Sequence, residues 1–102
     1  MATNQSFDPR YGSGITVTPD VTSASSVVGL GNKSLNLTNL SATVVVYVRV
    51  GTSAATFTAT TADFPVLPGQ RVVISKAHES DTVAYISSAP GSLHIIPGEG
   101  YA

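Results

Sequence analysis

The densest cluster of ionisable side chains in this 102-residue sequence is His78-Glu79-Ser80-Asp81. A histidine beside two carboxylates could act as an acid/base pair or hold a metal ion. A catalytic zinc ion needs three protein ligands, and a zincin needs two histidines four positions apart on a helix. The sequence has only one other histidine, His94, which is remote from the cluster. The cluster lies between two expected strands, so we interpret it as a solvated hairpin loop without a metal ion.

Three further patterns point away from catalysis. Gly29-Leu30-Gly31-Asn32-Lys33-Ser34 differs from a phosphate-binding loop, because Asn32 separates the glycine from the lysine and a strand follows where a helix is needed. A serine hydrolase elbow of the form Gly-x-Ser-x-Gly is absent. His94 alternates with Leu93 and Ile95, which places it on the opposite face as a surface or interface residue. We therefore expect no catalytic residues, no cofactor and no enzyme activity.

Composition narrows the range of partners. Charged residues make up 11% of the chain, with Lys+Arg 5 against Asp+Glu 6, and the basic residues are scattered singly. Nucleic-acid binders need clustered Lys and Arg to neutralise phosphates, so we expect no nucleic-acid partner. The N-terminus has no signal-peptide pattern and no stretch approaches the ~18 apolar residues of a membrane span, so we expect a protein that stays soluble and does not enter a membrane. The chain has no cysteine that could form disulfides or thiolate zinc sites.

The chain beyond residue 14 consists of short segments rich in Val, Ile, Thr and Leu, separated by turn residues. This spacing predicts an all-β fold. In the most apolar run, 43–50, the valines at even-numbered positions lie on one face, so we expect it to be a central strand. Segment 54–61 could be an edge strand or an extended loop. The other expected strands are 15–18, 26–28, 33–39, 64–67, 71–75, 82–87 and 92–96.

Three Pro-Gly dipeptides, Pro68-Gly69, Pro90-Gly91 and Pro97-Gly98, each predict a chain reversal, because proline and glycine suit the central positions of a type II turn. No window has the apolar period of a helix. Short strands with polar turns can close as a jelly roll, an immunoglobulin-like sandwich or a small barrel. We favour a jelly-roll-like β-sandwich that spans residues 15–102 as a single domain.

Residues 1–14 are polar, contain Pro and Gly, and lack an apolar period. We interpret them as a flexible N-terminal arm. The arm nevertheless carries two of the few aromatic residues of the chain, Phe7 and Tyr11, on either side of Pro9. Aromatic side chains often dominate protein interfaces, so we expect Phe7, Pro9 and Tyr11 to bind a partner.

The order of several motifs resembles a known class of proteins. These motifs are Leu-x-Leu-Thr-Asn at 35–39, Val-Tyr-Val-Arg-Val-Gly at 46–51, Phe-Pro-Val-Leu-Pro-Gly-Gln at 64–70, Val-Val-Ile at 72–74, Val-Ala-Tyr-Ile-Ser at 83–87 and Leu-His-Ile-Ile-Pro-Gly-Glu-Gly at 93–100. Residues 33–100 resemble the small β-structured virion proteins of tailed bacteriophages that decorate or cement the capsid. The first 32 residues do not share this resemblance.

The resemblance implies a structural protein on the capsid surface of the virion. Its partners would be the major capsid protein or other virion proteins, and it would associate with its own copies as a dimer or trimer over local two-fold or three-fold positions of the shell. The same class includes neck and head-completion proteins. A receptor- or glycan-binding module of a tail or fibre is the alternative from another functional class. The resemblance transfers no catalytic or binding residues.

Overall fold

The computed structural model describes residues 8–29, 33–52, 57–76 and 80–99. Regular structure in these ranges consists of strands alone, so the described residues include no helix that could cross a membrane. The nine strands are β1 (Asp8–Pro9), β2 (Ile15–Val17), β3 (Ala24–Val27), β4 (Ser34–Asn39), β5 (Val46–Gly51), β6 (Phe64–Val66), β7 (Arg71–Ser75), β8 (Thr82–Ser87) and β9 (Leu93–Glu99). The expected all-β fold is confirmed.

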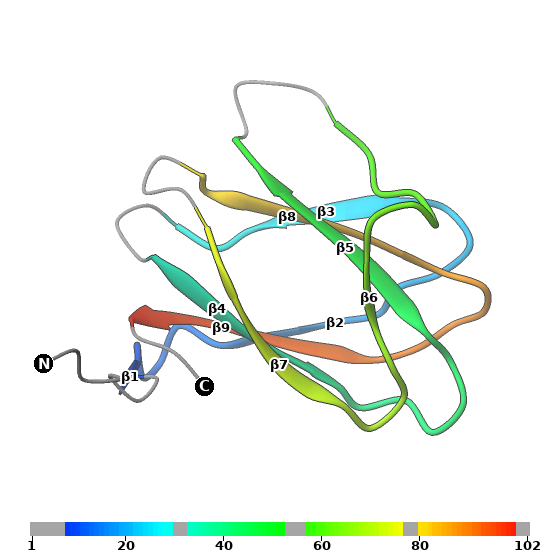
Figure 1. Ribbon diagram of the computed structural model, residues 1–102, viewed down its shortest axis with the longest axis horizontal. Helices are drawn as coiled ribbons and strands as arrows, with labels where there is room; N and C mark the ends of the chain where they lie inside the picture. Colours follow the sequence, from blue (N-terminus) through cyan, green and yellow to red (C-terminus); the bar gives the residue numbers. More distant parts are fainter. Residues whose placement is uncertain (1–7, 30–32, 53–56, 77–79, 100–102) are drawn as a thin grey trace, which may run out of the picture.

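The strands form two antiparallel sheets that lie face to face (Figure 1). The first sheet has the order β1-β9-β4-β7, with β2 also paired to β9, and the second has the order β3-β8-β5-β6. The pairs β5 with β6, β4 with β7, β3 with β8 and β2 with β9 are nested inside one another. Successive pairs alternate between the two sheets, so the chain is one long antiparallel ribbon that rolls up into a sandwich. This is jelly-roll topology, as the sequence predicted.

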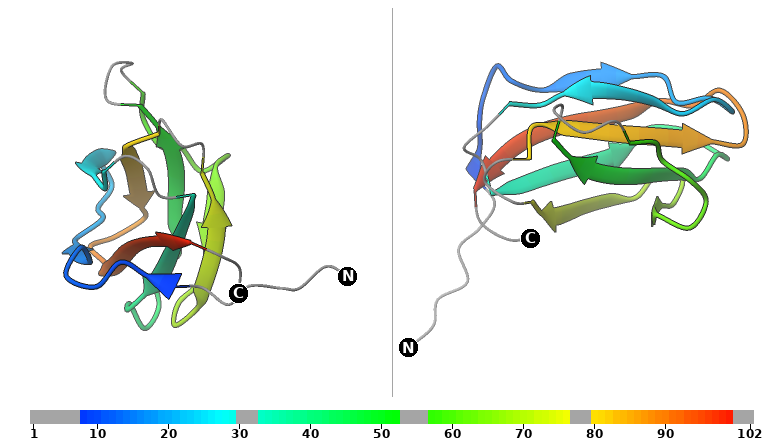
Figure 2. Two further views of the ribbon diagram at one scale, coloured as in Figure 1. Left: turned by 90° about the vertical axis from the view of Figure 1, so that its left-hand side faces the viewer. Right: turned by 90° about the horizontal axis from the view of Figure 1, so that it is seen from above.

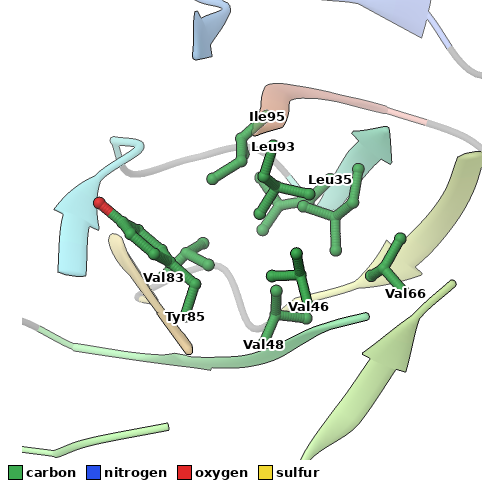
Figure 3. Packing of buried hydrophobic residues seen from close by; sticks show 9 residues of the cluster. Leu35, Val46, Val48, Val66, Val83, Tyr85, Leu93 and Ile95 are labelled. Atoms are coloured by element: carbon green, nitrogen blue, oxygen red, sulfur yellow. The ribbon is translucent and has the colours of Figure 1, made fainter. Parts of the chain in front are cut away.

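Alternation along the strands builds the core between the sheets. In β4, Leu35 and Leu37 are fully buried, and in β5 Val46 and Val48 are buried while Arg49 is exposed. Figure 3 shows side chains from both sheets meeting in this layer. The cluster comprises Leu35, Leu37, Val46, Val48, Val66, Val83, Tyr85, Leu93 and Ile95. Fully burying an aliphatic side chain of this kind stabilises a fold by roughly 1.5–3 kcal/mol, so this layer is the main source of stability.

The segment expected as an edge strand or an extended loop, 54–61, has no strand in its described part, residues 57–61. It belongs to the connection between β5 and β6. A Cβ atom on Gly51 would lie only 2.9 Å from the Phe57 ring, and the Ala59 amide donates a hydrogen bond to Ser23 Oγ. Ala84 in β8 alternates with core residues and so faces outward, yet it is fully buried. The connection therefore passes over the outer face of the second sheet.

The three Pro-Gly motifs have different roles. At Pro68-Gly69 the expected reversal is confirmed, since Gly69 has φ +72° and the Gln70 amide donates to the Leu67 carbonyl. Pro90-Gly91 lies in the loop from β8 to β9, where Gly91 has no positive φ, so this reversal is not a type II turn. The prediction for Pro97-Gly98 is wrong, because both residues continue β9, where they pair with Leu35 and Ser34.

Strand β9 can contain Pro97 because of a gap along one of its edges, between the residues that pair with β1 and those that pair with β2. Proline is compatible with a sheet where its missing N–H would not be needed for pairing. The Arg10 amide donates to the Pro97 carbonyl, which places the N–H position of Pro97 on the side of β1 and β2. That side changes partner at this point, from β2 opposite Leu93–Ile95 to β1 opposite Gly98 and Glu99. The Arg10 carbonyl, which Pro97 cannot bond, accepts instead from the Ser13 amide.

The flexible arm expected over residues 1–14 must be corrected for its described part. Asp8 and Pro9 form β1, paired with Glu99 and Gly98 of β9, so the first sheet starts before residue 15. A segment without apolar alternation becomes a strand here because the edge of β9 provides backbone partners. Residues 1–7, including Phe7, lie outside the described residues.

Candidate partner-binding site

Residues Arg10–Ser13 form a tight turn directly after β1. The Ser13 amide donates to the Arg10 carbonyl at 3.1 Å, and Gly12 has φ +83° at the third position, as a type II turn requires. Tyr11 occupies the second position and is 84% exposed. The turn holds an aromatic ring out from the surface.

The backbone of this turn is fixed to the sheet on both sides. Before the turn, Pro9 pairs with Gly98 and the Arg10 amide donates to Pro97 at 2.9 Å. After it, the backbone passes close to the sheet, since a Cβ atom on Gly14 would lie 2.9 Å from His94 Nε2. Strand β2 then begins at Ile15. Figure 2 shows the blue N-terminal strands β1 and β2 along the orange-red strand β9. A ring presented from an ordered turn loses little conformational freedom on binding, which favours affinity.

Of the three residues expected to bind a partner, the structure places two. Pro9 is half-buried, and its pairing with Gly98 places it on the outer face of the first sheet, next to the exposed Tyr11 turn. Phe7 is outside the described residues. Sequence reasoning missed the turn that fixes Tyr11, although Tyr11-Gly12 is a recognisable signal, because glycine supplies the positive φ of a type II turn.

Four loops gather at one end of the sandwich (Figure 1): 18–23, 40–45, 67–70 and 88–92. We call this the four-loop end. Asp20 is its only charged residue, while Val21, Leu40 and Leu67 are each more than half exposed. Backbone hydrogen bonds connect the loops, including those from the Leu40 amide to Ser92 and from the Gly91 amide to Pro19. This end is an ordered, nearly uncharged surface.

Asn39 organises the four-loop end from inside and was missed by sequence reasoning. Its side chain is 1% exposed. Nδ2 donates to the carbonyl oxygens of Val44 and Val66 at 2.7 and 2.9 Å, and Oδ1 accepts from the Ser41 amide. These bonds connect the end of β4 to β6 and to the loop before β5. A signal for its burial was available in the alternation of β4. Asn39 follows Leu35 and Leu37 at intervals of two residues, which places all three side chains on the core face.

The described part of the His78-Glu79-Ser80-Asp81 cluster is structural. The solvated loop expected from sequence is wrong for Ser80, which is 8% exposed and whose carbonyl accepts from Lys76 Nζ at 2.7 Å. Lys76 is itself only 8% exposed, and nothing local in the sequence indicates that this lysine is buried. The Asp81 carbonyl accepts from the Val28 amide. His78 and Glu79 lie outside the described residues, and the described residues contain no group of three or more potential metal ligands.

His94 is on the outer face of the first sheet, as its alternation with Leu93 and Ile95 predicted. Both neighbours are fully buried in the core, and His94 is half-buried. It pairs with Thr38 on one side and with Thr16 on the other. None of these neighbours is a carboxylate or a second imidazole, so the described surroundings of His94 do not form a catalytic or metal-binding constellation.

Comparisons with known proteins support the fold and leave function open. No known protein family and no curated protein sequence matches the chain. Among solved structures, the crystal structure of PirA is similar with a TM-score of 0.54 over 86% of this chain and 95% of that chain, at 10% identity. At this identity the likeness concerns the fold alone. A protein of Bacillus endospore appendages, described as disulfide-linked pili, aligns over 100% of this chain and 96% of its own at 16% identity, but its TM-score of 0.48 is too low to support a conclusion.

Proposed function

We propose that this chain is a non-enzymatic assembly protein that packs against other protein surfaces, specifically a capsid decoration protein of a tailed bacteriophage. In this role it would be made in the host cytoplasm and bind the outside of the shell, contacting the major capsid protein. The observation that carries the proposal is the Tyr11 side chain, 84% exposed on a turn that is fixed to β9. An aromatic ring in this setting is well suited to insert into a pocket of a partner.

Two further properties support an assembly role. Jelly rolls are frequent in viral capsid proteins, which favours a virion protein at the level of fold analogy. The four-loop end adds a second surface with almost no charge, and the cores of protein interfaces are depleted in charged residues. The ordered motifs at residues 33–100 that resemble small phage virion proteins lie in β4–β9, which include most of the core.

Shell binding tests the proposal directly. The major capsid protein encoded in the same genome should be assembled into shells, expanded, and incubated with the full chain, and the bound fraction should be measured by co-sedimentation. We expect Tyr11→Ala to weaken binding at least about tenfold, since aromatic hot spots commonly contribute 2 kcal/mol or more. Tyr11→Phe should bind within a few-fold of the parent chain because it keeps the ring.

Phe64→Ala is the matched control, because Phe64 is also an exposed aromatic residue, at 45%, but lies on β6 in the other sheet. It should leave shell binding unchanged. If the full chain does not bind shells, or if Phe64→Ala weakens binding as much as Tyr11→Ala does, the proposed role of the Tyr11 turn is wrong.

A glycan- or receptor-binding module of a tail or fibre remains the second candidate, because jelly rolls also occur in lectin domains. The exposed Tyr11 ring could stack against a sugar. Binding of the isolated chain to a glycan array or to host cells, lost in Tyr11→Ala, would favour this function over decoration. A neck or head-completion role would instead give binding to portal or tail components and not to the shell.

A further inference from the structure

Strand β7 forms an open edge of the first sheet. It pairs with β4 on one side and is the last strand in its sheet on the other. Natural proteins usually protect such edges with prolines, bulges, central charges or very short strands. β7 has five residues, contains no proline or glycine, and has its single charge, Arg71, at one end. The described part of the chain therefore leaves this edge unprotected.

The direction of the backbone groups in β7 follows from its pairing with β4. The Asn39 amide donates to the Gln70 carbonyl, and the Lys76 amide donates to the Lys33 carbonyl. In an antiparallel pair, the residues that bond to the partner alternate with residues that point the other way. Even-numbered residues of β7 thus bond to β4, and the N–H and C=O groups of Arg71, Val73 and Ser75 point outward.

We propose that β7 pairs in antiparallel fashion with β7 of a second copy of this chain, about a two-fold axis through Val73. In this register Val73 faces Val73 of the second copy, and Arg71 faces Ser75. All three outward-pointing residues then form hydrogen-bonded pairs, each exchanging two backbone hydrogen bonds. The first sheets of the two copies become one continuous sheet.

The side chains also match in this register. Arg71 meets an uncharged serine, so no like charges oppose each other across the axis. On the inner face, Val72 lies opposite Ile74 of the second copy. Both residues are only partly buried and pack at the margin of the core in the single chain. Pairing would bring the margins of two cores together and bury more of this apolar surface.

The other edges are less suited to this pairing. β6 has three residues, one of which is Pro65. β3 has four residues, and its core-facing side holds the Ser26 hydroxyl, bonded to Tyr85, where β7 has valine and isoleucine. The edge formed by β1 and β2 is interrupted between Pro9 and Ile15. β7 is the edge strand with the longest uninterrupted backbone.

This inference deepens the proposed assembly role by naming a contact between copies, and it is tested without a shell. Sedimentation velocity of the full chain should be followed up to about 1 mM, because a contact of this size lies at the low end of specific interfaces. The parent chain should form a dimer. Val73→Lys and Val73→Glu should each reduce association at least tenfold, since like charges would meet on the axis, and mixing the two variants should restore a dimer.

Ser25→Lys is the matched control, because Ser25 is an exposed residue on β3, an edge strand of the second sheet at the opposite side of the sandwich. It should dimerise like the parent chain, as should Tyr11→Ala, so that failure of shell binding and failure of dimerisation remain separate results. A monomeric parent chain, or a dimer unaffected by both Val73 variants, would overturn the proposal.

Amide hydrogen exchange provides a test that needs no variant. In the dimer, the amides of Arg71, Val73 and Ser75 should exchange slowly, whereas on dilution to the monomer only those of Val72 and Ile74 should stay protected. Concentration-independent exchange at Val73 in a dimeric sample would show that the copies associate through another surface.

Discussion

At the scale of single residues, two asparagines on β4 should affect stability in opposite ways, because Asn39 is hydrogen-bonded and the Asn36 oxygen is not, in the part of the chain that the structure describes. The amide of Asn39 makes three hydrogen bonds at the four-loop end. Asn39→Ala would leave the carbonyl groups of Val44 and Val66 without this donor in a buried place, which should lower the free energy of unfolding by about 2–4 kcal/mol. Urea denaturation followed by tyrosine fluorescence or far-ultraviolet circular dichroism would measure the change.

Asn36 provides the matched control, three positions earlier on the same strand. Its Oδ1 is buried without a hydrogen-bond partner among the described residues, and its cross-strand neighbours are Val73 and Ile96. Asn36→Val should therefore be neutral or stabilising, by up to about 1 kcal/mol, because it removes a desolvated acceptor and adds apolar contact. A large loss of stability here, or none in Asn39→Ala, would contradict this assignment.

The same two residues show what sequence can provide at this scale. Alternation places residues 35, 37 and 39 on the core face and 36 on the outer face, so burial of Asn39 follows from parity alone. Its partners do not, because Val44 and Val66 reach it only through the folding of two loops against each other. Position on a face is a local property, whereas a hydrogen-bond network depends on the complete topology.

The backbone conformation of Gly69 alone predicts how substitutions at this position change stability. With φ +72° and open space around a Cβ atom, a substitution here is strained by conformation and not by collision. Gly69→Val should destabilise by at least about 1 kcal/mol, and Gly69→Asn by less, since asparagine tolerates positive φ better. Equal midpoints of thermal unfolding for the two variants would exclude a turn of this type.

At the scale of elements, strands were predictable where alternation is continuous. The bounds of β7 and β8 match the expected segments, since nearly every residue in them has a defined face. The prediction failed at Pro97-Gly98 because the local turn signal does not decide the structure there. Pro97 can stay in β9 because it lies opposite the gap between β1 and β2, which are far from β9 in sequence. The prediction failed at Asp8–Pro9 because two residues show no period, so the edge of β9 alone determines this strand. Tyr11-Gly12 was a local signal for the turn that holds Tyr11, but nothing local in the sequence indicates that this turn is fixed to β9.

The contribution of the connection from β5 to β6 to the stability of the fold can be measured separately. Gly51→Ala would place a Cβ atom 2.9 Å from the Phe57 ring and displace it, so it should destabilise the fold by about 1–3 kcal/mol. Phe57→Ala should also destabilise, because it uncovers part of the outer face of the second sheet.

The double variant should then be more stable than the sum of the two changes implies, because the collision requires both side chains. Chemical denaturation of the parent chain, both single variants and the double variant would measure this coupling. Additive effects would mean that Phe57 does not cover Gly51 in solution.

At the scale of the whole molecule, the described part of the N-terminal segment belongs to the first sheet through Asp8 and Pro9. Deleting residues 2–13 removes the pairing of β1 and the Arg10–Pro97 hydrogen bond, but no member of the core cluster. The shortened chain should keep a β-type far-ultraviolet spectrum and lose about 1–2 kcal/mol of stability. Tyr11→Ala should stay within about 0.5 kcal/mol of the parent chain, as an exposed site does. Complete unfolding of the shortened chain would mean that the domain depends on β1 for its stability.

The nested pairing of the strands also predicts the order in which the strand pairs form during folding. Closing the β5–β6 pair joins Val48 to Phe64, whereas the β2–β9 pair joins Ile15 to Ile95 across most of the sequence. Long closures cost more chain entropy, so the ribbon should form from its centre outward, and a chain dominated by such distant pairs should fold in milliseconds to seconds.

Stopped-flow kinetics would reveal this order. Val66→Ala, at the centre of the ribbon, should mainly slow folding, and Ile15→Ala, near its outer end, should mainly accelerate unfolding. The reverse pattern would place the nucleus at the outer pair. If the order holds, β2 is among the last strands to dock and the first to detach, and the Tyr11 turn beside it takes up its final geometry only after the rest of the domain has folded.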